Sequence, residues 1–249
     1  MIARAAAAAS QARGTRTSFA FLGAACIIAC FSAAPAEAQV GATASIFSDA
    51  RFRGFSLSEG RPVGILDVAY DDPSGFYGDV SASGLLRRGG DPAPLGVQLT
   101  GGYARDLASG TTLDFGITHS SYGHYSKGER SKSYSELYAG IARGGLSSRI
   151  FVSPHYFERG RWTAYGEING NVSPLPKWTL DGHVGLLTTL RHPAGERYSR
   201  DVDWRVGVTR ELGRLSLHAA WSDGVPGHDH YAGQVHSRSS VVLGASWVL

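Results

Sequence analysis

The stretch from Trp178 to Leu186 reads WTLDGHVGL, and it decides the fold class. Its even-numbered residues are apolar or glycine, whereas its odd-numbered residues are polar or glycine. A period of two places successive side chains on opposite faces of a β-strand, and no helical spacing fits it. The same alternation of apolar residues recurs at Leu113, Phe115 and Ile117, at Val202, Trp204, Val206 and Val208, and at Val241, Leu243, Ala245, Trp247 and Leu249. The sequence therefore predicts an all-β protein.

About twelve segments of this kind follow one another, bounded by clusters of Gly, Pro, Asp and Ser. Most are close to the roughly 9 to 11 residues that a tilted strand needs to cross a bilayer. The alternation is weakest near residues 63–86 and 147–155, so ten strands are an alternative. The expected spans are 42–55, 63–71, 75–86, 94–105, 111–120, 133–143, 147–155, 162–172, 177–190, 202–210, 214–222 and 238–249.

The connections between these spans alternate between longer and shorter. The first, 56–62, is followed by the short 72–74, and the last, 223–237, is the longest. Outer-membrane barrels have this pattern because both chain ends lie in the periplasm, so long loops lie outside and short turns inside. A soluble β-sandwich has no reason to show it. We therefore predict an antiparallel up-and-down transmembrane β-barrel of about twelve strands, with both termini periplasmic.

The composition agrees with a surface that faces lipid. Of 249 residues, 18% are charged and 33 are glycine, whereas ordinary soluble chains have roughly 25% charged residues and 7% glycine. Glycines inside the predicted strands, such as Gly102 and Gly185, are expected to ease curvature or to leave room in the lumen. The formal net charge of +3 is too small to indicate nucleic acid as a partner, and we expect no cofactor.

The first residues have the features of a secretory signal peptide. Three arginines precede an apolar segment over 19–31, and Ala36-Glu37-Ala38 is a small-x-small cleavage site. We expect a signal peptide over 1–38, cleaved after Ala38, and a barrel over 39–249. Both cysteines lie inside the signal, so the mature chain has no disulfide. A lipoprotein cleavage at Cys30 is an alternative, because the residues before it resemble a lipobox.

The polar face of the predicted strands faces the lumen of such a barrel and carries most of its charge. Eight acids and four arginines share it, which gives an acidic excess. Charges there are tolerated if water fills the lumen or if they pair. The predicted pore-lining residues are Asp49, Arg51, Arg53, Asp67, Asp79, Asp114, Glu136, Arg149, Glu167, Asp181, His183, Asp203, Arg205 and His218.

Aromatic residues on the apolar face collect near both ends of the predicted strands. Amphipathic rings favour the two interfaces of a bilayer, so these residues are predicted to be membrane-interface anchors. Those at the periplasmic level are Tyr70, Phe76, Tyr103, Trp178 and Trp247. Those towards the outside are Phe52, Trp162, Trp204 and Trp221.

Several segments, in order, resemble a known family. Residues 49–60, DARFRGFSLSEG, are similar to a YRFRGISQS start, and LPKWTL at 175–180 with HVG at 183–185 is similar to a late hairpin. Further similar segments are SGFYG at 74–78, GGY at 101–103, SELYAG at 135–140 and SPHYF at 153–157. Together they resemble the TorF family of porins over nearly the whole mature chain. The resemblance implies an outer-membrane barrel and a pore, and it carries no catalytic motif.

These features favour an outer-membrane passive diffusion channel for small hydrophilic solutes, weakly selective for cations, and not an enzyme. A plugged structural barrel without conductance is the alternative, because a barrel of about twelve strands lies between a side-chain-filled interior and an open channel. The expected partners are outer-membrane lipid, lipopolysaccharide and the barrel assembly machinery. Outer-membrane barrels usually end in an aromatic residue, whereas this chain ends Trp247-Val248-Leu249.

A lipid hydrolase is a further alternative. His119 and Ser121 share one side of a predicted strand, and Glu129 or Glu136 could orient the histidine. Serine is common in this chain, so such a pair also arises by chance.

A metal site is the last alternative. His228, Asp229 and His230 offer imidazole and carboxylate ligands for Zn or Cu. Scattered loop histidines are more often merely solvated, so we predict no metal.

Overall fold

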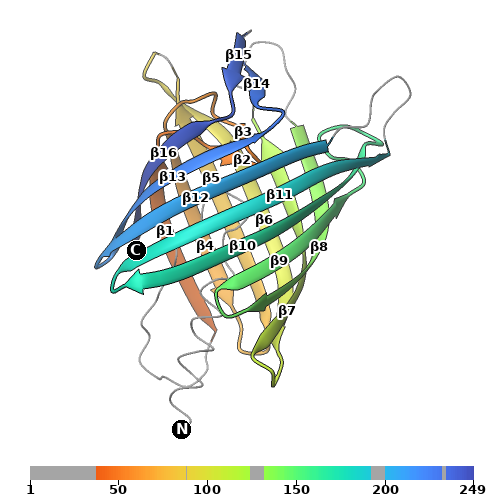
Figure 1. Cartoon of the computed structure of the whole chain (residues 1–249), viewed down its shortest axis with the longest axis vertical. Helices are drawn as coiled ribbons and strands as arrows, with labels where there is room; N and C mark the ends of the chain where they lie inside the picture. The colour runs from red at the N-terminus through yellow and green to blue at the C-terminus, as the bar shows by residue number, and fades with distance from the viewer. Residues whose placement is uncertain (1–37, 88, 124–131, 192–199, 232–233) are drawn as a thin grey trace.

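The computed structural model describes residues 38–87, 89–123, 132–191, 200–231 and 234–249, in which twelve strands form one closed barrel (Figure 1). The barrel strands are β1 (Gln39–Phe47), β4 (Val63–Asp71), β5 (Phe76–Leu86), β6 (Pro92–Asp106), β7 (Thr111–Tyr122), β8 (Lys132–Arg143), β9 (Leu146–Ser153), β10 (Trp162–Leu175), β11 (Trp178–Arg191), β12 (Arg200–Leu212), β13 (Leu215–Val225) and β16 (Ser240–Val248). Within these described ranges, no helix is long and apolar enough to span a membrane.

Each barrel strand pairs antiparallel with the barrel strands before and after it, and β1 pairs with β16 to close the ring. At this closure Thr43 lies opposite Val248, and Phe47 lies opposite Gly244. The predicted antiparallel up-and-down barrel of twelve strands is therefore confirmed. The ten-strand alternative is wrong.

The short connections lie at one end of the barrel, which we call the turn end, and the long ones at the other, the loop end. Gln39 pairs with Asp71 beside the first short turn. The Val248 amide donates a hydrogen bond to the carbonyl oxygen of Arg214 in the last short turn. Both ends of the barrel sequence therefore lie at the turn end. The short turns span 72–75, 107–110, 144–145, 176–177 and 213–214, and the long connections span 48–62, 87–91, 123–131, 154–161, 192–199 and 226–239.

Apolar side chains cover the outside of the barrel, whereas polar side chains and two clusters of buried apolar and aromatic residues fill the inside. On β7, Phe115 and Ile117 are 51% and 48% exposed, whereas Asp114 and Thr118 are buried. This is the reverse of a soluble barrel, and it agrees with an outer surface that meets lipid.

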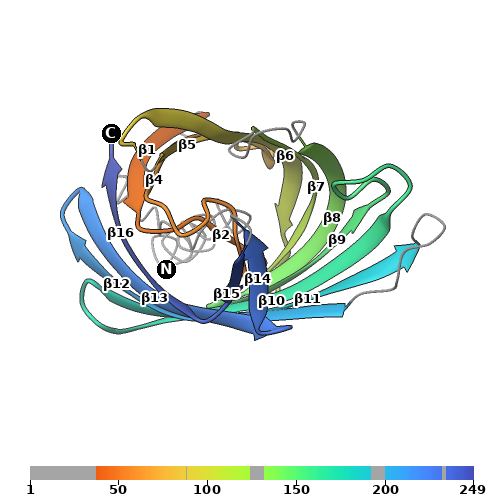
Figure 2. The ribbon, with the colours of Figure 1, turned by 90° about the horizontal axis from the view of Figure 1, so that it is seen from above.

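The first strand is shorter than predicted. It ends at Phe47, and residues 48–62, which we call the inner segment, turn into the barrel (Figure 2). The inner segment contains the two-residue strands β2 (Arg51–Phe52) and β3 (Phe55–Ser56). The predicted strand over 42–55 is therefore wrong beyond residue 47.

Apolar contacts explain why the inner segment folds inward. Ala50 is fully buried in a cluster with Val63, Leu85 and Leu95 of the inner wall, and Leu57 packs against the same cluster. Removing such side chains from water is favourable, at roughly 25 cal/mol per Å². The part of the wall that contacts Ala50 and Leu57 is itself apolar. Both faces of β4 therefore carry apolar residues, and the alternation near 63–86 is weak.

Close packing of tyrosines on glycines accounts for part of the glycine content. A Cβ added at Gly185 would overlap the ring of Tyr165, and one added at Gly102 would overlap the ring of Tyr77. Both rings point into the lumen and are buried. The expectation that strand glycines leave room in the lumen is confirmed at these two positions.

Substituting Gly185→Ala is expected to lower the free energy of unfolding by about 1–3 kcal/mol, because the added methyl group overpacks the ring of Tyr165. Urea unfolding of the protein refolded in lipid vesicles measures this change. Gly166→Ala is the matched control, since a Cβ there meets nothing within 4 Å. Equal effects of the two substitutions would contradict the packing argument.

Candidate functional site

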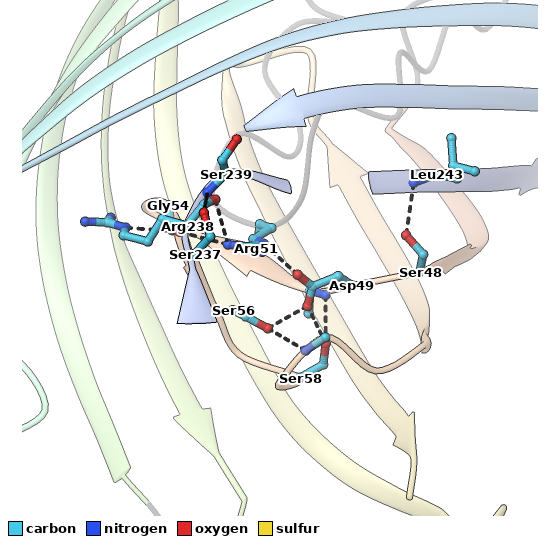
Figure 3. Close-up of polar contacts among 12 residues, drawn as sticks. Ser48, Asp49, Arg51, Gly54, Ser56, Ser58, Ser237, Arg238, Ser239 and Leu243 are labelled. Carbon is cyan, nitrogen blue, oxygen red and sulfur yellow. Dashed lines mark hydrogen bonds and ion pairs between the residues drawn. The ribbon is translucent and has the colours of Figure 1, made fainter. Parts of the chain in front are cut away.

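Hydrogen bonds fasten the inner segment to the barrel wall and join its two arms (Figure 3). The Ser48 amide donates to the carbonyl oxygen of Leu243 over 2.8 Å, and the Leu243 amide donates to Ser48 Oγ over 3.0 Å. The Asp49 carboxylate accepts hydrogen bonds from the hydroxyls of Ser56 (2.6 Å) and Ser58 (2.8 Å). The tip of the segment is thereby held at a defined position in the lumen.

The tip itself is a two-residue turn between β2 and β3. Arg53 and Gly54 have φ angles of 49° and 77°, and positive φ at both central residues is typical of a type I′ hairpin turn. An arginine in this region is uncommon. Its side chain explains the choice: Nη1 and Nη2 of Arg53 donate to Oε1 and Oε2 of Glu136 over 3.0 and 2.6 Å. This bidentate ion pair connects the tip to β8 across the lumen.

Aromatic rings surround the Arg53 guanidinium. The distances from its Cζ atom to the ring centroids are 4.0 Å for Tyr165, 4.8 Å for Phe52, 5.2 Å for Tyr156 and 5.6 Å for Phe151. Cation–π attraction strengthens when the groups are desolvated, and only 5% of the arginine side chain is exposed. Burial raises the pKa of Tyr156 to about 12, so its hydroxyl stays protonated.

Arg238 joins the last long connection to the same tip (Figure 3). This side chain is fully buried and donates to the carbonyl oxygens of Arg53 (2.7 Å), Gly54 (3.3 Å) and Pro226 (3.1 Å). Its guanidinium lies 3.9 Å from the ring centroid of Phe55. The hairpin of β14 (His228–Tyr231) and β15 (Gln234–Ser237) belongs to this connection, so the loop end and the inner segment are mechanically linked.

Each of the four predicted lumen arginines has a carboxylate partner. The pairs are Arg51 with Asp49 (2.5 Å), Arg53 with Glu136 (2.6 Å), Arg149 with Asp114 (2.5 Å) and Arg205 with Asp181 (3.0 Å). A fifth acid, Asp203, lies 2.9 Å from His183 Nε2 and also accepts a hydrogen bond from Tyr165. The positive charges of the four lumen arginines are therefore compensated at short range.

Two small cavities lie beside the inner segment. Their volumes are about 60 and 50 Å³, and Arg51, Arg205 and Ser222 line both. A site of this size holds only a few water molecules. The inner segment therefore leaves only small spaces beside Arg51, Arg205 and Ser222.

The structure brings most of the predicted pore-lining residues together. Lining one or both cavities are Arg51, Arg53, Glu136, Glu167, Asp181, His183, Asp203, Arg205 and His218. Asp49 lies next to them through its ion pair with Arg51. Asp114 and Arg149 bond to each other, and Arg149 lies opposite Glu167 in the pairing of β9 with β10. Asp67 and Asp79 lie on β4 and β5 and line neither cavity.

Four positions require correction. Asp49, Arg51 and Arg53 were expected on the first barrel strand, but they lie on the inner segment, because the chain leaves the wall after Phe47. The Phe52 ring, expected to face outward, is buried in the lumen against the Arg53 side chain.

Several residues of the site were not predicted. Arg238 is the first residue of the predicted strand over 238–249, but in the structure it lies just before β16, in the last long connection. The Tyr165 and Asn169 side chains share the inward parity of Glu167 on β10. Tyrosine and amide side chains at the inward-facing positions of the predicted strand would have indicated Tyr165 and Asn169.

The arrangement does not support a lipid hydrolase. His119 is exposed on the outside of the barrel, where its Nδ1 lies 2.9 Å from Ser135 Oγ. Glu136 points to the opposite face and is paired with Arg53, so it cannot orient that histidine. The other candidate carboxylate, Glu129, lies outside the described residues.

Metal-ligating side chains do not converge in the described part of the chain, where no group of three or more His, Cys, Asp or Glu could hold a metal ion. The side chains of Asp229 and His230 lie outside the described set. The described residues therefore do not test the alternative of a Zn or Cu site at these residues.

The predicted interface anchors point outward near the ends of the barrel. Near the turn end, the Phe76 and Tyr103 rings are 5.1 Å apart, and Arg210 lies 5.0 Å from the Trp178 ring. Also exposed or half-exposed are Tyr70, Trp162, Trp204, Trp221 and Trp247.

Replacing Arg238 with Met is expected to release the tip of the inner segment, because three hydrogen bonds from a charged group are lost. Amide hydrogen exchange over residues 51–56 should accelerate by roughly tenfold or more. Arg214→Met is the control, since that side chain lies exposed in a short turn. Unchanged exchange in the Arg238 variant would show that the tip is held without it.

Comparisons with known proteins agree with this architecture. The NanC porin matches with a TM-score of 0.54 and 10% identity, over 85% of this chain and 100% of that one. The KdgM porin matches with a TM-score of 0.50 and 11% identity, over 83% of this chain and 98% of that one. At such identities the likeness is one of fold, that of outer-membrane porins. No curated protein matches the sequence. The model of a family described as "Bacterial protein of unknown function (Gcw_chp)" matches residues 32–248, and the chain belongs to this family.

Proposed function

We propose that this protein is a narrow, passive diffusion channel of the bacterial outer membrane for small hydrophilic solutes. The observation that carries the proposal is a polar lumen narrowed by an inward-folded segment, inside a barrel whose outer face is apolar. The porin fold of the similar structures supports it. The resemblance of segments such as residues 49–60 to the TorF family of porins supports it further.

The orientation follows from the two ends of the barrel. In our proposal residues 1–38 direct export, the turn end faces the periplasm, and the long connections face outward toward lipopolysaccharide. The outward aromatic side chains anchor the barrel at both membrane interfaces. The assembly machinery would read a C-terminus in which Trp247 and Leu249 are 47% and 63% exposed.

A weak cation preference is expected from the charges that remain after pairing. Four of the eight predicted lumen acids are paired with arginines. Three of the others, Asp67, Asp79 and Glu167, take part in none of the arginine–carboxylate pairs of the described residues. Carboxylates facing a narrow polar lumen raise the local concentration of cations.

A plugged barrel is the second candidate, and one observation favours it. The Arg53–Glu136 ion pair is only 5% and 4% exposed, so the tip of the inner segment is packed into the lumen. Such a barrel would serve a structural or adhesive role without conductance. We do not propose an enzyme, because His119 and Glu136 lie on opposite faces of the barrel wall.

Single-channel recording in planar bilayers separates the two candidates. Wild-type protein is expected to give small, discrete conductance steps. Arg53→Ala should give larger steps and a reversal potential shifted toward cations, because the change removes a bulky cation and leaves the Glu136 carboxylate in the lumen.

Arg105→Ala is the control, since Arg105 is exposed near the turn end and does not enter the lumen. Heat-dependent migration in gels checks that each variant is folded. If folded wild-type and Arg53→Ala proteins both give no discrete steps, the channel proposal fails and the plugged barrel is supported.

A further inference from the structure

We infer that the lumen contains a binding site for a small uncharged polyol, built on Arg205 and Ser222. The inference rests on the proposed channel function and names the class of solute that the channel would recognise.

Two buried polar atoms carry the inference. Ser222 Oγ and Arg205 Nε have no hydrogen-bond partner in the described structure. These residues lie directly opposite each other on β13 and β12, and Ser222 is only 4% exposed. Buried polar groups in proteins are almost always paired, because an unpaired one costs about 1–3 kcal/mol. Two such groups side by side therefore indicate a ligand that completes them.

Both groups face the space beside the tip of the inner segment. Arg205 and Ser222 line both cavities, and the larger one, about 60 Å³, has room for about four waters. A solute that replaces these waters and offers as many hydrogen bonds would carry several oxygens on a short carbon skeleton. Rings of Phe52, Phe151 and Tyr165 line the same cavity and can pack against such a skeleton.

Charge balance and hydrogen-bonding capacity together favour an uncharged solute. The arginines beside the site, Arg51, Arg53 and Arg205, each have a carboxylate within 3.0 Å. A carboxylate on the solute would bring an uncompensated negative charge into a desolvated space, which is costly. An ammonium group has only donors, so it offers no acceptor for Arg205 Nε.

A hydroxyl avoids this cost because it both accepts and donates. It can accept hydrogen bonds from Arg205 Nε and from the Ser222 hydroxyl. It can donate to a carboxylate of the same cavity, such as Asp203 or Glu167.

Erythritol, a four-carbon tetrol, is the probe for this site. Saturation-transfer NMR with the refolded full-length protein in micelles is expected to detect millimolar binding. Ser222→Ala and Arg205→Lys should each weaken erythritol binding roughly threefold to tenfold, since each removes one hydrogen-bonding group. Arg205→Lys keeps the positive charge beside Asp181, and Ser222→Ala changes the volume little, so both variants are suited to refolding.

Ser153→Ala is the matched control, because Ser153 is also buried in the wall but donates to the Ser135 carbonyl and lines neither cavity. Its affinity for erythritol should equal that of the wild type. Two further probes test the solute class: 1,4-butanediol, with the same carbon chain and two fewer hydroxyls, and erythronate, its anionic relative, should both bind more weakly.

The outcomes are distinct. Unchanged erythritol affinity in both site variants, or binding of butanediol as tight as that of erythritol, overturns the polyol site even if the wild type conducts. Tighter binding of erythronate overturns the choice of an uncharged solute. Selective erythritol binding that is weakened in the site variants, without conductance in any variant, supports the site and refutes the channel.

Discussion

The backbone ladder between β1 and β16 is the constraint on which the rest of the structure depends. Lipid offers no partner for an unpaired amide or carbonyl, so strands in a membrane must form a closed ring. Here the register that pairs Thr43 with Val248 closes the ring of twelve strands. Once the ring is closed, the outer face can be apolar and the charged side chains gather inside. A composition with only 18% charged residues follows from this geometry.

Inside the ring, the inner segment determines what the lumen can do. Its tip carries Arg53 in an uncommon positive-φ conformation, which is stabilised by the bidentate pair with Glu136 and by the surrounding rings. Arg238 holds the same turn from the loop end through three backbone carbonyls. Arg51 of the inner segment lines both cavities, together with Arg205 and Ser222 of the wall.

The sequence predicted most strands correctly because a barrel wall exposes one face to lipid and the other to polar side chains along its whole length. Strand prediction failed where the chain leaves the wall or where the inner face of the wall is apolar. The predicted first strand extends to residue 55, because the alternation continues through DARFRG after the chain has left the wall. The weak alternation near 63–86 has the same origin, since Ala50 and Leu57 make the inner wall apolar there.

By itself, the sequence determined the all-β class, the alternation of long and short connections, the outward apolar face and most of the polar side chains of the lumen. These properties are local, since each depends on the spacing of neighbouring residues. Only the tertiary structure decided which carboxylate each arginine meets, where the inner segment lies and which groups line the cavities. Arg53 and Glu136 are 83 positions apart, and they meet only because the closed barrel places β8 opposite the tip of a segment folded into its lumen.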